Sequence, residues 1–132
     1  MKLALQVAIL ALGGVLAACG DDMPTDTGPS LLATALPTTI AAGGDVTVTV
    51  TADHFTLEVP GGPNASGHGH YHVYLDGATG GNYLAEDAAA SVQVTIPGTT
   101  VPGPHTLRVE LANNDHSALN PAVSTMIDLT VQ

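Results

Sequence analysis

The stretch Val46-Thr47-Val48-Thr49-Val50-Thr51 alternates strictly between an apolar and a hydroxyl-bearing side chain. In an extended strand this period of two places the valines on one face and the threonines on the other. The turn sequence Ala42-Gly43-Gly44-Asp45 precedes it. The stretch therefore predicts a β-strand that packs one face against a core.

The same alternation recurs along the chain between clusters of Gly, Pro, Asn and Ser, without an amphipathic helix of useful length. Short strands separated by turn residues are typical of an antiparallel sandwich. We predict an all-β, immunoglobulin-like antiparallel β-sandwich of about seven strands without a disulfide. In this fold the strands 70–76 and 105–112 are antiparallel neighbours. The predicted strands cover residues 31–36, 45–52, 70–76, 91–96, 105–112 and 123–131.

The charge balance limits the classes of partner. The 132 residues include 12 acidic and 2 basic side chains, which gives a net charge of −10. A negative field of this size repels phosphate backbones, so we expect no nucleic-acid binding. Apolar residues make up 45% of the chain, which is the composition of a folded domain rather than of a disordered one.

The N-terminus has the features of a secretory signal. Lys2 is followed by an apolar run and by Leu16-Ala17-Ala18-Cys19, an ending that resembles the bacterial lipobox. The resemblance implies that residues 1–18 are a lipoprotein signal peptide and that Cys19 carries the lipid. Gly20, rather than an aspartate, follows the cysteine, and this resembles the outer-membrane-sorted class of Gram-negative lipoproteins. We therefore expect an extracytoplasmic, lipid-anchored protein in the bacterial outer membrane. The alternative is an ordinary cleaved signal with a coincidental cysteine.

The rest of the chain divides into two parts on this interpretation. Residues 19–30 are rich in Asp, Gly and Pro and predict an acidic flexible tether, and residues 31–132 form the β-sandwich domain.

Histidines supply the chemistry of this sequence. His68, His70 and His72 alternate along one predicted strand, so their side chains share a face, while Tyr71 and Val73 face the core. We expect the three imidazoles to project from the outer face of the sheet, within reach of solvent. Imidazoles at this spacing can converge on one ion, as bonds of about 2 Å to zinc require.

A second group follows the strand 105–112. Antiparallel pairing brings Asp115 and His116 to the same end of the sheet as the histidine strand. We predict that His68, His70, His72 and His116, with Asp115 as ligand or orienting group, bind a divalent transition metal. This set of donors suits zinc, copper(II) or nickel(II) better than copper(I), and we expect zinc or copper.

Other interpretations of these polar residues stay open. Asp115 is also placed to cap a turn through its own side chain, and the histidines would then be surface residues of a polar strand. His54 follows a predicted bend, which leaves its facing undefined. His105 begins its strand at the opposite end of the sheet, so a structural role with backbone carbonyl partners is favoured for it.

The two motifs together resemble a family of small secreted bacterial β-domains of unknown function. The first is Gly67-His68-Gly69-His70-Tyr71-His72, in a strand that ends at Asp76. The second is Pro102-Gly103-Pro104-His105-Thr106-Leu107 with Asp115-His116 after it. The resemblance covers about residues 55–131 and implies the β-fold, the histidine cluster and a recurrent role for His105. The family often has a His-rich segment between the motifs, whereas residues 81–87 here contain no histidine.

Three functions are compatible with these features. The first is a lipid-anchored domain that binds copper or zinc outside the cytoplasm. The second is a structural or adhesive immunoglobulin-like module that contacts a protein partner and binds no metal. The third is a metalloenzyme, which we do not expect, because copper–zinc superoxide dismutases, which share a sandwich and a His-x-His strand, need more ligands than this end of the sheet offers. Ser66 and Ser117 lie near histidines, but neither belongs to a recognisable nucleophile motif.

The lipid anchor gives the first test. In a bacterial host, Cys19→Ser should lose the acyl group and move from the membrane fraction to the soluble fraction, because no other anchor is expected. Cell fractionation followed by immunoblotting measures this distribution. A Cys19→Ser protein that stays in the membrane pellet would contradict the assignment.

Overall fold

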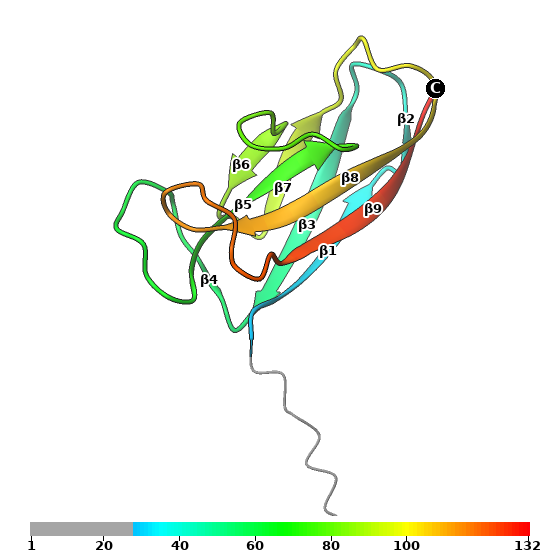
Figure 1. The fold of residues 1–132 in the computed structure, drawn as a ribbon. Helices are drawn as coiled ribbons and strands as arrows, with labels where there is room; N and C mark the ends of the chain where they lie inside the picture. The colour runs from blue at the N-terminus through cyan, green and yellow to red at the C-terminus, as the bar shows by residue number, and fades with distance from the viewer. Residues whose placement is uncertain (1–27) are drawn as a thin grey trace, which may run out of the picture.

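A computed structural model describes residues 28–132. Two predicted parts lie outside the described residues: the signal peptide 1–18, and residues 19–27 of the tether, which include Cys19. Within residues 28–132 the chain forms strands and loops (Figure 1), and no helix there is long and apolar enough to cross a membrane. The strands are β1 (Ser30–Leu36), β2 (Thr39–Ile40), β3 (Asp45–Asp53), β4 (Thr56–Leu57), β5 (His68–Leu75), β6 (Ala85–Asp87), β7 (Ser91–Thr95), β8 (Gly103–Ala112) and β9 (Ser124–Val131).

The strands form two sheets. One has the order β1-β3-β7, and its pairs are antiparallel. The other has the order β2-β9-β8-β5-β4, with β6 paired to β5 as well. Strand β5 runs antiparallel to β8 along one edge, and it pairs with β4 and then β6 along the other. It is therefore an interior strand of its sheet.

A single hydrophobic core lies between the two sheets. Val46, Val48 and Val50 of β3 are buried on one side of it, and their threonine neighbours are exposed, as the alternation predicted. The other sheet contributes Tyr71 and Val73 of β5, together with apolar residues of β8 and β9. Removing apolar surface from water stabilises the folded state by about 25 cal/mol for each Å² buried, and this is the main force that holds the sheets together.

The all-β fold class is confirmed. Each of the six predicted strands overlaps an observed one, and β5 and β8 are antiparallel neighbours as expected. The described residues also form three strands of two or three residues, β2, β4 and β6, outside the six predicted ranges. Strand β4 lies within the alternation of Phe55, Leu57 and Val59, whereas β2 and β6 are too short to show such a pattern. The immunoglobulin-like topology stays a prediction.

Burial on both faces distinguishes β5 from the other strands. Its six residues from Gly69 to Tyr74 are all buried. The side chains of Tyr71 and Val73 belong to the core, so those of His70, His72 and Tyr74 lie on the opposite face. Strand β6 and the loop 76–84 cover that face, since Tyr83 stacks on His72 and Tyr74 reaches Gly80. The expectation of solvent-exposed histidines on this strand is therefore wrong for His70 and His72, because that face has its own cover.

Gly69 allows the close approach between β5 and its surroundings. A Cβ atom there would lie 2.0 Å from the carbonyl oxygen of Ala112 and 3.0 Å from the ring of Phe55. Gly69→Ala should therefore force the backbones apart and lower the free energy of unfolding by at least about 2 kcal/mol.

Urea denaturation of the two proteins measures this loss. Gly77→Ala is the matched control, because a Cβ at Gly77 meets no atom within 4 Å. A Gly69→Ala protein that is as stable as Gly77→Ala would show that the packing around β5 is looser than described.

Candidate metal centre

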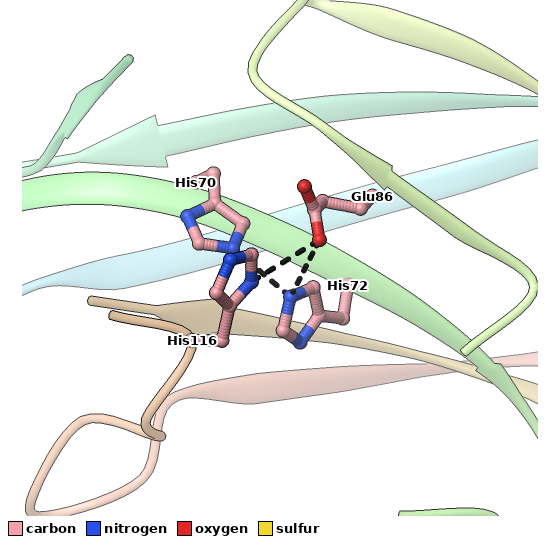
Figure 2. Close-up of side chains that lie close together, drawn as sticks. All are labelled: His70, His72, Glu86 and His116. Carbon is pink, nitrogen blue, oxygen red and sulfur yellow. Dashed lines mark hydrogen bonds and ion pairs between the residues drawn. The ribbon is translucent and has the colours of Figure 1, made fainter. Parts of the chain in front are cut away.

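Four side chains converge on the covered face of β5. They are His70 and His72 of β5, Glu86 of β6 and His116 of the loop after β8. One ligand atom from each lies within 4.8 Å of all the others, and such a group could hold a metal ion. Figure 2 shows the three imidazoles and the carboxylate pointing toward one another from these three segments.

Strand pairing places three of the four residues. Alternation along β5 gives His70 and His72 a common face, as the sequence predicted. Glu86 lies directly opposite His72 in the antiparallel β5–β6 pair, so the two side chains also share a face. Their closest approach joins His72 Nε2 to Glu86 Oε2 at 3.6 Å.

His116 reaches the cluster from the loop 113–117. The β5–β8 register pairs His70 with Ala112, and this brings the loop after β8 next to the histidines. His116 has a φ of 67°, in the left-handed region that histidine adopts more often than most residues. Its ring lies 4.9 Å from the ring of His70 and 5.7 Å from that of His72, centroid to centroid. The prediction that antiparallel pairing brings His116 to the same end of the sheet as the histidine strand is confirmed.

Hydrogen bonds fix the tautomer of His72. The Tyr74 hydroxyl donates its single hydrogen to the carbonyl oxygen of Gly80, at 3.0 Å. The contact of 3.0 Å between this hydroxyl oxygen and His72 Nδ1 must therefore have Nδ1–H as its donor. Nε2 of His72 then carries a lone pair and is directed into the cluster. The Nε2 atom of His70, 2.9 Å away, donates to this lone pair.

Burial keeps these imidazoles neutral. Loss of hydration lowers the pKa of His72 to about 4, and the neighbouring His70 lowers it further while Glu86 opposes the shift. Burial lowers the pKa of His70 as well. Coordination of a transition metal requires neutral rings with a free lone pair. His72 presents such a lone pair on Nε2, and His70 must move its hydrogen from Nε2 to Nδ1 before Nε2 can bind an ion.

Glu86 is the anionic member of the cluster. Burial acts to raise its pKa, but a hydrogen bond from Tyr83 and the nearby imidazoles outweigh this and hold the pKa below the usual value. Its Oε2 atom is buried and has no hydrogen-bond partner among residues 28–132, although it lies 3.1 Å from His116 Nδ1. A buried carboxylate oxygen without a hydrogen bond is a natural ligand for a cation.

The spacing of the donor atoms fits an ion after small movements. With bonds of about 2.0–2.1 Å, two ligand atoms of a tetrahedral site lie about 3.3 Å apart. The Nε2 atoms of His70 and His72 are at 2.9 Å, so they must separate slightly. The four donor atoms lie within 4.8 Å of one another, and the less buried side chains are those of His116 and Glu86, 47% and 23% exposed.

The structure does not bring the other predicted ligands into this cluster. His68 Nδ1 lies 3.2 Å from Glu58 Oε2 at the beginning of β5, and its side chain is 43% exposed. The Oδ1 atom of Asp115 accepts hydrogen bonds from the backbone and the hydroxyl of Ser117, which is the turn-capping alternative. His54 is exposed at the end of β3 and also lies outside the cluster.

Glu86 was missed because no local signal marks it. Residues 81–87 contain no histidine and no long alternation, and Glu86 reaches the site only because β6 pairs with the free edge of β5. A pairing of three residues, Tyr71–Val73 with Ala85–Asp87, is too short to be predicted from the sequence alone.

A comparison with protein-family models found no match, and neither did a comparison with curated proteins. The resemblance to a family of secreted β-domains therefore stays a prediction, and the site rests on its own geometry.

His105 has the structural role that the sequence favoured. At the opposite end of β8 from the cluster, its Nε2 contacts the carbonyl oxygen of Val101 at 2.8 Å, and its Nδ1 lies 2.9 Å from Asp76 Oδ2. The hydrogen bond to Asp76 raises the pKa of His105. Both ring nitrogens therefore have a partner that favours the protonated imidazole.

This ion pair predicts a pH dependence of stability. A raised pKa in the folded state stabilises the fold below about pH 6.5, the titration point of an unfolded histidine, and this contribution is lost as the pH rises through the folded value. Asp76→Asn removes the charge but keeps an oxygen for the backbone N–H of Thr106. The variant should therefore be less stable than the wild type near pH 5.5, and the difference should shrink near pH 9.

Urea denaturation in the presence of a chelator, at both pH values, measures this difference. The chelator prevents metal binding at the cluster from contributing to it. A gap between wild type and Asp76→Asn that is equally large at both pH values would contradict the ion-pair account.

Proposed function

We propose that this protein binds one divalent transition-metal ion, zinc or copper(II), through His70, His72, Glu86 and His116. The observation that carries the proposal is the convergence of four donor atoms within 4.8 Å on a buried face. Three imidazoles and one carboxylate, with no thiolate, are donors that suit zinc and copper(II) better than copper(I). The domain would act outside the cytoplasm, held at a membrane through lipid on Cys19.

Support for a metal also comes from groups next to the ligands. The bond from His72 Nδ1–H to Tyr74 directs Nε2 at the site, which is how outer partners orient a metal-binding imidazole. Tyr83 contributes twice, since its ring stacks on His72 at 4.4 Å and its hydroxyl lowers the pKa of the Glu86 carboxyl. These contacts define where the ligands point before an ion arrives.

The alternative is a structural or adhesive module in which the cluster only fills space. The bond of 2.9 Å between His70 and His72 favours it, because the two rings partly satisfy each other without a metal. On this alternative the protein would contact a protein partner through its loops and would retain no ion.

Metal content and thermal stability distinguish the two. Untagged protein should retain close to one equivalent of zinc or copper(II) after gel filtration, measured by elemental analysis. Because binding is restricted to the folded state, an ion concentration 100 times Kd should raise the free energy of unfolding by about 2.7 kcal/mol. The domain should also fold without metal, since the core between the sheets has its own apolar residues.

Two variants and one control localise the effect. Glu86→Gln keeps the shape of the side chain and should weaken binding by about tenfold or more, and His70→Ala with His72→Ala should abolish it. His68→Ala should leave binding unchanged, because His68 lies outside the cluster. If Glu86→Gln binds metal as tightly as the wild type, Glu86 is not a ligand. If the wild type retains no metal, the structural alternative is favoured.

A further inference from the structure

The four residues of the cluster differ sharply in exposure. His70 and His72 are 0% and 2% exposed. The side chain of His116 is 47% exposed, and that of Glu86 is 23% exposed. An ion held by all four would therefore face protein on the β5 side and solvent on the His116 side.

The buried side of the cluster is rigid. His70 and His72 belong to β5, which is hydrogen bonded to neighbours along both edges. The ring of His72 is held by Tyr74 on one nitrogen and is stacked against Tyr83. The bonds from these two imidazoles to an ion can break only if β5, or the segments that cover it, move.

On the exposed side, hydrogen bonds hold the backbone around His116, and its side chain is 47% exposed while its ring contacts Glu86, His70 and His72. Asn114, two residues before His116, donates hydrogen bonds to Glu58 and to the carbonyl oxygen of Pro63. On the other side of His116, the carbonyl oxygen of Ser117 accepts a hydrogen bond from the backbone N–H of Asn113, which closes the loop. The loop is therefore anchored on both sides of His116, and rotation of its imidazole is the smallest movement that opens the coordination shell.

We infer that the protein passes its metal to an acceptor by ligand exchange at His116. The inference rests on the proposed function and extends it from binding to transfer. A nitrogen or sulfur donor of the acceptor forms a bond to the ion from the solvent side, and the bond from the ion to His116 breaks. His116 leaves as a neutral imidazole, no electron moves, and the remaining three ligands hold the ion until further donors of the acceptor replace them, one metal–ligand bond at a time.

This route predicts a specific rate law. If the incoming donor attacks the bound ion, the rate of transfer rises in proportion to the acceptor concentration. If the ion must first dissociate from a closed site, the rate is independent of the acceptor. The chelator 4-(2-pyridylazo)resorcinol offers nitrogen donors and changes colour when it binds zinc, so it serves as the acceptor in stopped-flow measurements on the zinc-loaded protein.

His116→Gly should make transfer faster at every chelator concentration, by about tenfold or more, since changes outside the ligand shell already alter metal affinity by that factor. Glycine accepts the left-handed backbone at this position, so the loop keeps its shape. His54→Gly is the matched control, because His54 is also exposed and has a φ of 54° but lies outside the cluster. Its transfer rate should equal that of the wild type.

The outcomes separate the two proposals. A wild-type rate independent of chelator concentration, or a His116→Gly protein that transfers zinc no faster than the wild type, overturns exchange at His116 while leaving metal binding intact. Loss of all zinc is expected only for the double variant of His70 and His72. A His116→Gly protein that retains no zinc would show that His116 is needed to hold the ion, and this also overturns the inference. Wild-type protein that retains no zinc before chelator is added overturns the proposed function itself.

Discussion

The candidate site depends on the burial of β5 on both of its faces. One face supplies Tyr71 and Val73 to the core between the sheets, and the other is covered by β6 and the loop 76–84. A strand in the interior of a sheet has its backbone hydrogen bonds satisfied along both edges, so its side chains are held in fixed positions. Two imidazoles two residues apart on such a strand are therefore oriented before any ligand is present. The same burial removes their hydration and keeps them neutral.

Charge is distributed around this strand so that a single carboxylate faces the imidazoles. In the register of the sheet His72 lies between Glu86 on β6 and Glu110 on β8. Arg108 pairs with Glu110, donates to the carbonyl oxygen of Ala78 and lies 4.5 Å from the centre of the Tyr74 ring. It is the one Lys or Arg among residues 28–132. Arg108 thus neutralises one neighbour of His72 and leaves Glu86 as the negative group at the site, while its bonds hold down the loop that covers the histidines.

The sequence predicted those features that depend on local pattern and on antiparallel geometry. The valines of β3 indicated a core-facing strand, and the spacing of His70 and His72 gave their common face. The pairing of β5 with β8 then placed His116 beside them. Features that depend on short, non-local pairings could not be predicted in the same way. Glu86 reaches the site through three paired residues, and the cover over β5 has no repeating pattern, so the burial of the histidines was missed.

The two predicted ligands outside the cluster illustrate the same limit. His68 has the parity of His70 and His72, but at the first position of β5 its ring is drawn to Glu58. Asp115 is next to His116 in sequence, yet it accepts hydrogen bonds from Ser117 in the turn. The position along a strand and the distance in sequence indicate which side chains can reach the cluster. The hydrogen bonds that each side chain makes determine which of them lie in it.

We propose that His70, His72 and His116 act together as ligands, with the Nε2 atom of His72 already deprotonated in the metal-free protein. Long-range ¹H–¹⁵N NMR spectra of the six histidines, recorded before and after addition of one equivalent of zinc, test it most directly. We expect His72 to carry its proton on Nδ1 in both states, and zinc to shift the ring nitrogens of His70, His72 and His116 while those of His54, His68 and His105 stay in place. A His72 protonated on Nε2, or zinc-induced shifts centred on His68, would contradict the account.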